Sequence, residues 1–181
     1  MNKLKLYIST GKFKRTILNV PTNCRPVKDI VKQSAFSFIG SEFIRNKNVL
    51  DLYSGSGQLG FEALSQKAKS VTFVDNDYNS RESIKKTIQK LNLMDNTVVI
   101  HKDALKVIGE IDQKFDIIFA DPPYNYKHKH LLKTVNYVLN NNGIFIFFHS
   151  SKIEKTNLFV EGLSKIQTRI FGLSAYSVYK I

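Results

Sequence analysis

The chain has 181 residues, of which 43% are hydrophobic and 23% charged, a composition typical of one soluble globular domain with at most a small extension. Its only cysteine, Cys24, excludes an intrachain disulfide and suits a reducing cytoplasm, which is the location we expect. No apolar run reaches the roughly 18 residues of a transmembrane helix, and the alternation of apolar and polar residues at the N-terminus predicts no signal peptide.

The formal net charge of +12 is distributed unevenly along the chain. Residues 1–47 hold ten Lys and Arg against two acidic residues, whereas residues 48–181 hold seventeen against thirteen. A basic cluster of this kind is the electrostatic footprint of a nucleic-acid-binding protein. The basic residues that we predict to contact nucleic acid are Lys12, Lys14, Arg15, Arg25, Lys28 and Lys32.

The hydrophobic pattern predicts two short strands, then a helix that follows Arg25-Pro26 and ends at Gly40, and from residue 49 an alternation of strands and helices. The predicted elements are strands at 4–8, 16–20, 49–53, 70–75, 97–101, 115–120 and 144–149, helices at 58–67, 78–91, after Asp103 and at 127–139, a turn at 141–143, and a closing strand pair at 163–171 and 174–180. We therefore expect a basic N-terminal extension, residues 1–45, and an α/β domain, residues 46–181. The expected fold is a Rossmann-like doubly wound sheet, mostly parallel with an antiparallel edge strand.

A glycine-rich loop, Asp51-Leu-Tyr-Ser-Gly55-Ser-Gly57-Gln-Leu-Gly60, stands between the first strand of this alternation and the next helix. With Asp75 at the end of the following strand, the glycines also fit a dinucleotide-binding fingerprint, so a nicotinamide dehydrogenase is one alternative. Asp51, however, precedes the loop where a pyrophosphate would lie, and an anion there repels phosphate. The same anion suits the ammonium group of a methionine moiety, which favours S-adenosylmethionine as the cofactor.

Acidic residues also end the next two strands. Asp75 can accept hydrogen bonds from ribose hydroxyls, and Asp103 from an adenine amino group; alternatively, each of them caps the helix that follows. The predicted cofactor-binding residues are Asp51, Tyr53, Gly55, Ser56, Gly57, Asp75, Asn76, Asp103 and Ala104.

A second motif, Asp121-Pro122-Pro123-Tyr124, follows the fully apolar strand predicted at 115–120. Its residues suit methylation of a planar amino group, whose nitrogen lone pair is delocalised and therefore a poor nucleophile. The Asp121 carboxylate and the Pro122 carbonyl can accept the two amino hydrogens, and Tyr124 can stack on a base. We predict these four residues as the catalytic site. Neither a metal nor a covalent nucleophile is required.

Taken together, the glycine loop with its extension Gly60-Phe-Glu-Ala-Leu-Ser, the segment Val74-Asp75-Asn-Asp77 and Asp121-Pro-Pro-Tyr resemble bacterial 16S rRNA guanine-N2 methyltransferases of the RsmD type. The resemblance covers nearly the whole chain and implies a class I S-adenosylmethionine-dependent methyltransferase. It further implies methylation of a guanine amino group in 16S rRNA, within the small ribosomal subunit or its assembly intermediate.

The N-terminal part departs from the family pattern. Thr10-Gly11 and Lys14-Arg15-Thr16 stand where the family has Gly-Gly and Arg-Gly-Arg, so several basic or polar contacts of the family are lost or weakened here. Three alternatives remain: an adenine-N6 methyltransferase, a protein-glutamine methyltransferase, and an inactive methyltransferase-fold module that only binds RNA. We expect a monomer.

Overall fold

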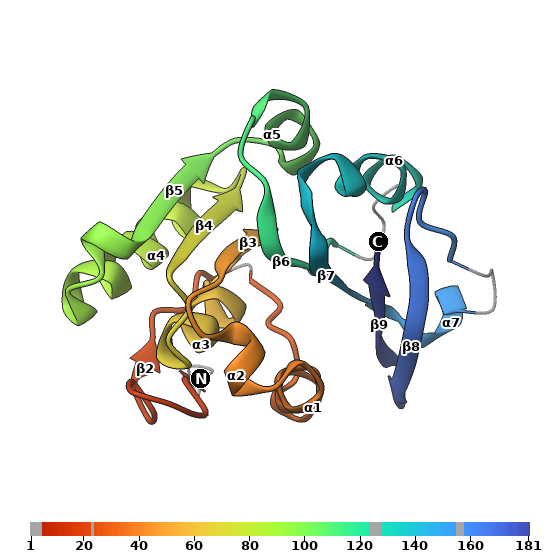
Figure 1. Ribbon diagram of the computed structural model, residues 1–181. Helices are drawn as coiled ribbons and strands as arrows, with labels where there is room; N and C mark the ends of the chain where they lie inside the picture. Colours follow the sequence, from red (N-terminus) through yellow and green to blue (C-terminus); the bar gives the residue numbers. More distant parts are fainter. Residues whose placement is uncertain (1–4, 23, 124–127, 155–157) are drawn as a thin grey trace.

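The computed structural model describes residues 5–22, 24–123, 128–154 and 158–181 (Figure 1). Its strands are β1 (Leu6–Tyr7), β2 (Ile17–Leu18), β3 (Asn48–Leu52), β4 (Ser70–Asp75), β5 (Thr97–His101), β6 (Phe115–Ala120), β7 (Leu139–Ser150), β8 (Ser164–Phe171) and β9 (Ser174–Lys180). Its α-helices are α1 (Asp29–Ile39), α2 (Ser41–Ile44), α3 (Gln58–Ser65), α4 (Tyr78–Leu91), α5 (Ala104–Glu110), α6 (His128–Thr134) and α7 (Ser151–Glu154). Two 3-10 helices, η1 (Met94–Asn96) and η2 (Val135–Val138), complete the set.

The main sheet has seven strands in the order β5-β4-β3-β6-β7-β9-β8. The five strands from β5 to β7 pair in parallel, and β9 pairs antiparallel with both β7 and β8. The order reverses at β3, from which the chain proceeds first toward β5 and then back across to β6. The predicted doubly wound, mostly parallel sheet is thus confirmed, and its antiparallel strand β9 lies one place inside the edge strand β8.

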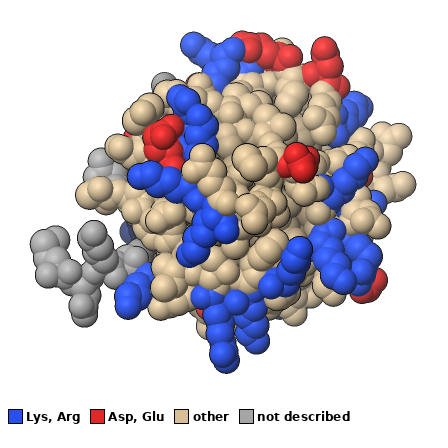
Figure 2. Space-filling view, turned by 90° about the vertical axis from the view of Figure 1, so that its left-hand side faces the viewer, with Lys and Arg blue, Asp and Glu red and all other residues tan. Residues whose placement is uncertain are grey.

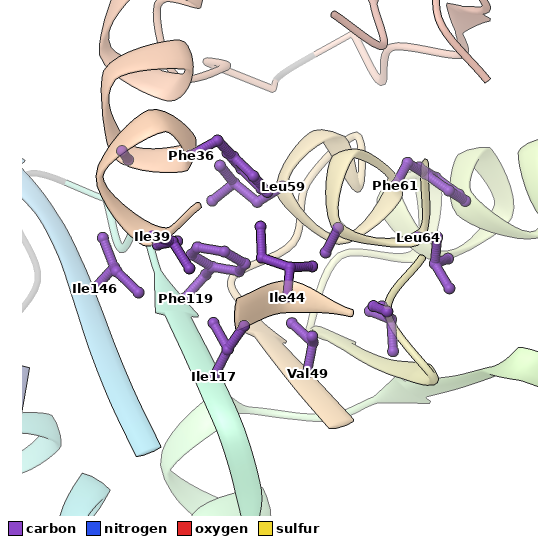
Figure 3. Close-up of a cluster of buried hydrophobic side chains, with 14 of the residues drawn as sticks. Phe36, Ile39, Ile44, Val49, Leu59, Phe61, Leu64, Ile117, Phe119 and Ile146 are labelled. Carbon is purple, nitrogen blue, oxygen red and sulfur yellow. The ribbon is translucent and has the colours of Figure 1, made fainter. Parts of the chain in front are cut away.

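Helices cover both faces of the sheet, and each face buries its own apolar cluster. Helices α1 to α4 lie on one face, α5 and α6 on the other (Figure 1). Alternate residues of β3 explain the division, because Val49 belongs to the first cluster and Leu50 to the second. Figure 3 shows the first cluster, in which Phe36 and Ile39 from α1 and Leu59 from α3 point toward Phe119 on β6.

The basic N-terminal extension contributes to the same core as the rest of the chain. Ile8, Leu18 and Ile44 are buried in the cluster that contains Val49. A hairpin, β1 with β2, lies beside this layer. The proposed division at residue 45 therefore separates segments that differ in charge but share one hydrophobic core.

Residue Glu62 of α3 holds the N-terminal segment against the α/β part of the chain. Its carboxylate accepts hydrogen bonds from the backbone N–H groups of Ser9 and Thr10, each at 2.8 Å, and from the Thr10 hydroxyl at 2.6 Å. The side chain is 1% exposed, so these bonds compensate the desolvation of its charge. The loop around Gly11 is consequently held against α3.

The predicted turn at 141–143 is wrong as a separate element, because these residues lie inside β7. In the pairing of β6 with β7, Phe115 lies opposite Leu139, but Ile117, two residues later, lies opposite Ile144. The Asn-rich stretch is therefore a bulge, which takes up extra residues without ending the strand. Within the described part of the chain, every helix is too short or too polar to cross a lipid bilayer.

Candidate active site

A cavity of about 430 Å³ opens at the carboxyl ends of β3, β4, β6 and β7. Ligands bind at this edge in doubly wound sheets, at the point where the strand order reverses. The predicted site residues on its wall are Tyr53, Gly55, Ser56, Asp75, Asn76, Asp121, Pro122, Pro123, Arg25 and Lys28. The cavity therefore joins residues predicted separately for the cofactor, for the acceptor and for nucleic acid.

The glycine-rich loop has the backbone conformation that its sequence predicts. Gly55 and Gly57 have positive φ angles of 53° and 74°, and Gly57 donates its N–H to the Ser54 carbonyl at 2.7 Å. A Cβ atom at Gly55 would lie 2.7 Å from the Cys24 sulfur. A side chain at this position would therefore require Cys24 to move. Gly57 itself is buried and does not line the cavity.

Asp51 lies beneath the loop, not on the cavity wall. Its side chain is 1% exposed, and one carboxylate oxygen accepts the backbone N–H of Gly60 at 3.0 Å. The other oxygen, Oδ1, is buried without a hydrogen-bond partner among the described residues. Burial raises the pKa of Asp51 to about 8; the nearby carboxylates of Asp75 and Asp121 contribute to this increase, and the Gly60 hydrogen bond opposes it.

Asp75 closes the other side of the loop and lines the cavity with Asn76. Its carboxylate accepts the N–H of Gly55 at 2.7 Å and the N–H of Asp77 at 2.9 Å. Burial raises the pKa of Asp75 despite these two bonds. The side chain therefore fixes the loop conformation as well as facing the cavity.

Asp103 and Ala104 do not line this cavity. The Asp103 carboxylate caps α5 by accepting N–H groups of Leu105 at 3.0 Å and Lys106 at 3.3 Å, as in the capping alternative. Ala104 is buried against the second apolar cluster. The adenine contact of Asp103 stays a prediction.

The segment 121–123 follows β6 directly, as its sequence predicts. Asp121 and Pro122 border the cavity beside Pro123, whereas Tyr124 lies outside the described residues. Burial raises the pKa of Asp121 to about 7, and the Arg25 guanidinium partly opposes this shift. Asp121 thus titrates near neutrality, and it lies close enough to Asp51 to raise the pKa of that carboxylate.

Sequence reasoning missed the wall that β7 and β9 contribute. Phe148 and His149 reach the cavity from the carboxyl end of β7, next to the strand that carries Asp121. His149 is 3% exposed; its Nδ1 donates to the Ser150 carbonyl at 2.9 Å, and its Nε2 lies 2.9 Å from the Ser177 hydroxyl. The strand-end rule that identified Asp121 also applies to these two residues.

Cys24 is a second residue that the sequence did not place in the site. It lines the cavity between Arg25 and the loop residue Ser56. Burial raises the pKa of the Cys24 thiol, although Arg25 is its neighbour in the sequence. The thiol is therefore protonated at neutral pH and packs against the glycine loop.

The predicted nucleic-acid contacts fall into two groups. Arg25 and Lys28 are exposed at the cavity, and Lys12, Lys14 and Arg15 are exposed on the N-terminal loop. The prediction for Lys32 is wrong, because its side chain is 2% exposed. The Lys32 ammonium group lies 3.1 Å from the Asp29 carboxylate and 3.3 Å from that of Glu62, and it donates to the Tyr7 carbonyl at 3.0 Å. Its charge is therefore neutralised within the protein.

Comparison with known proteins supports the family resemblance that the sequence motifs indicate. A family model described as "Conserved hypothetical protein 95" matches residues 6–180. Ribosomal RNA small subunit methyltransferase D of Buchnera aphidicola is 34% identical over 157 residues, covering 82% of this chain and 79% of the relative. Its namesake in Haemophilus influenzae is 29% identical over 163 residues, covering 86% of this chain and 82% of the relative.

Solved structures agree with the fold. The Escherichia coli protein yhhF has a TM-score of 0.86 at 23% identity, and HI0767 from Haemophilus influenzae has 0.78 at 27%; each comparison covers 97% of both chains. The first of these proteins is described as a methyltransferase and the second as a methylase. These matches remove the dehydrogenase alternative. The chain belongs to the RsmD-type family of methyltransferases and has the class I S-adenosylmethionine-dependent methyltransferase fold.

Proposed function

We propose that this protein transfers the methyl group of S-adenosylmethionine to N2 of a guanine in 16S rRNA. The observation that carries the proposal is the single cavity in which the glycine loop and Asp75 face Asp121 and Pro122. A cofactor half and an acceptor half thus share one space, as transfer of a group between two bound molecules requires.

The cofactor half suits a cation. Carboxylates of Asp51, Asp75 and Asp121 lie close enough to raise the pKa of Asp51 by mutual repulsion, and Asp51 Oδ1 has no hydrogen-bond partner among the described residues. S-adenosylmethionine carries an ammonium and a sulfonium, so its charge relieves this repulsion, whereas a pyrophosphate would add to it. Asp75 and Asn76 line the same cavity and would accept the ribose hydroxyls, and the bound cofactor would supply the electrophilic methyl group.

The acceptor half suits a planar amino group. The ionised Asp121 carboxylate and the Pro122 carbonyl are hydrogen-bond acceptors at the end of β6, and the proline ring restricts the direction of that backbone. Accepting both amino hydrogens holds the nitrogen in line with the methyl donor and favours a localised lone pair. As the N–C bond forms and the S–C bond breaks, the nitrogen releases one proton.

The proposal of rRNA as the substrate rests on the positive charge at the cavity and on the similarity to the relatives named above. Arg25 and Lys28 carry positive charge at the cavity, which suits the phosphates on either side of a base that enters it. The relatives from Buchnera aphidicola and Haemophilus influenzae are named for small-subunit ribosomal RNA.

The test uses purified protein, radiolabelled S-adenosylmethionine and small ribosomal subunits from a strain that lacks the activity. The RNA and the ribosomal proteins are digested separately, and the labelled nucleoside or amino acid is identified. We expect label in N2-methylguanosine. Label in N6-methyladenosine, label in protein glutamine, or no label would each reject the guanine assignment, and would point respectively to the adenine enzyme, the glutamine enzyme and the inactive RNA-binding module.

A further inference from the structure

Helix α4 carries a concentration of positive charge that lies outside the basic first quarter of the chain. Its sequence, residues 78–91, contains Arg81, Lys85, Lys86 and Lys90 and a single acidic residue, Glu82. Figure 2 views the side of the molecule that carries α4, β5 and β2, and Lys and Arg predominate there over Asp and Glu. Like charges gathered on one face raise the free energy of the isolated protein and attract a polyanion.

The charges on α4 are not all neutralised within the protein. Glu82 lies 3.6 Å from Arg81 and 4.0 Å from Lys85. Among the ion pairs of the described residues, none involves Lys86 or Lys90. Both of these lysines are exposed, and their separation of four residues places them on one side of the helix, about 6 Å apart along its axis.

The N-terminal hairpin lies directly against this helix. Lys90 Nζ donates to the Ile17 carbonyl at 3.3 Å, and the Ser83 hydroxyl donates to the Asn19 carbonyl at 2.5 Å. Lys14 and Arg15 immediately precede β2 on the same hairpin and are exposed. Folding therefore joins two basic segments that are some seventy residues apart in sequence, as in the 73-residue separation of Ile17 and Lys90.

The other end of α4 begins at the active-site cavity. Asp77, which caps the helix, and Ser80 both line the cavity. From Ser80 to Lys90 the helix rises about 15 Å. A chain that leaves the cavity can thus follow α4 outward to the hairpin within the length of a few nucleotides.

We propose that Lys86 and Lys90 of α4, together with Lys14 and Arg15 of the hairpin, form a track that binds the phosphate backbone of the substrate RNA beside its target base. This inference rests on the proposed rRNA substrate. The track suits RNA better than an anionic membrane, because the apolar residues Ile84 and Ile88 of α4 are buried in the core and leave a polar outer side.

The test measures binding of unmodified small-subunit rRNA, transcribed in vitro, by filter binding over a range of KCl concentrations. Each phosphate contact contributes about 0.7 to 0.9 to the slope of log affinity against log salt, so Lys86→Gln/Lys90→Gln should lower that slope by about 1.5. The matched control is Lys106→Gln/Lys133→Gln, which removes two exposed lysines from α5 and α6 on the opposite layer and should leave the slope unchanged.

Because Lys90 also bonds the hairpin, Lys14→Gln/Lys86→Gln provides a second variant that leaves the Lys90 bond to Ile17 in place and should lower the slope equally. An unchanged slope in both α4 variants, or an equal fall in the control, would overturn the track. So would lysine-dependent binding to phosphatidylserine vesicles with an unaltered rRNA slope. The guanine assignment is tested separately: transfer to another nucleoside with the slopes as expected would reject that assignment and keep the track.

Discussion

The ammonium group of Lys32 lies 3.3 Å from the carboxylate of Glu62, and both side chains are almost completely buried. This pair connects α1 to α3, and Glu62 in turn holds the backbone of Ser9 and Thr10. Lys32, which the sequence predicts to contact RNA, instead belongs to the junction between the N-terminal extension and α3.

Replacing Lys32 with Ala should lower the free energy of unfolding by about 3 to 5 kcal/mol, because it leaves the buried Glu62 carboxylate without its ion-pair partner. Urea unfolding monitored by circular dichroism measures the change. Lys28→Ala, at an exposed position of the same segment, should change stability by less than about 0.5 kcal/mol. Equal losses in the two variants would contradict the internal role of Lys32.

Replacing Asp121 with Ala should reduce methyl transfer on the order of 100-fold or more, because an acceptor aimed at the amino group is lost. Calorimetric titration with S-adenosylmethionine should still show binding. If cofactor binding disappeared as well, Asp121 would belong to the cofactor half of the cavity.

The pKa of about 7 for Asp121 predicts a pH dependence of the same step. Only the ionised carboxylate accepts without donating, so kcat/KM for RNA should rise with pH through an apparent pKa at or below about 7; a bound cationic cofactor moves it downward. The rising limb should be absent from the residual activity of Asp121→Asn. A wild-type profile that is flat between about pH 5 and pH 8 would contradict this role.

The free energy of unfolding should fall as pH rises, owing to Asp51. Its pKa is about 8 in the folded protein, far above the ordinary value near 3.9, so between these values the folded state holds a proton that the unfolded chain has released. The limiting slope for one such group is about 1.4 kcal/mol per pH unit. Urea midpoints between about pH 5 and pH 8 measure it.

Asp51→Asn should flatten this dependence, since an amide oxygen can still accept the N–H of Gly60. Asp121→Asn serves as its control and should remove only the portion below about pH 7. If the Asp51→Asn variant were as steep as the wild type above about pH 7, Asp51 would have to be ionised in the folded state.

Cys24 should react slowly with iodoacetamide at neutral pH, because burial raises the pKa of its thiol. Bound S-adenosylmethionine should slow the reaction further, since Cys24 lines the same cavity as Gly55 and Ser56. Mass spectrometry with and without cofactor measures both rates. Faster modification in the presence of cofactor would place Cys24 outside the occupied part of the cavity.

The order of strands and helices could be predicted from the sequence because its signals are local. The strands β4, β5, β6 and β9 begin and end at the predicted residues, as does α4, which Asp77 caps by accepting the N–H of Ser80. The bulge in β7 could not be predicted, because an Asn-rich stretch followed by Gly143 is equally typical of a turn. Pairing with β6 decides between the two.

A place on the cavity wall could be predicted where a motif and a strand end coincide, as for Gly55, Asp75 and Asp121. Lys32 could not, because its partner Glu62 lies thirty residues away and helical spacing alone gives no sign of the contact. His149 was missed for another reason: no motif surrounds it, and its place in the cavity depends on β7 lying beside β6.

Helix α3 contacts the two functional regions at its opposite ends. In its first turn Gly60 donates its N–H to the carboxylate of Asp51, and its last turn holds the N-terminal loop, where Lys12 donates its N–H to the Ser65 carbonyl at 2.8 Å. The helix is eight residues long, about 12 Å, and connects the glycine loop, which we propose binds the cofactor, to the N-terminal loop. If ordering one end favours the other, linkage requires reciprocity: the factor by which RNA strengthens cofactor affinity equals the factor by which cofactor strengthens RNA affinity. In the proposed function, this short helix is the physical route by which cofactor binding and RNA binding would be coupled.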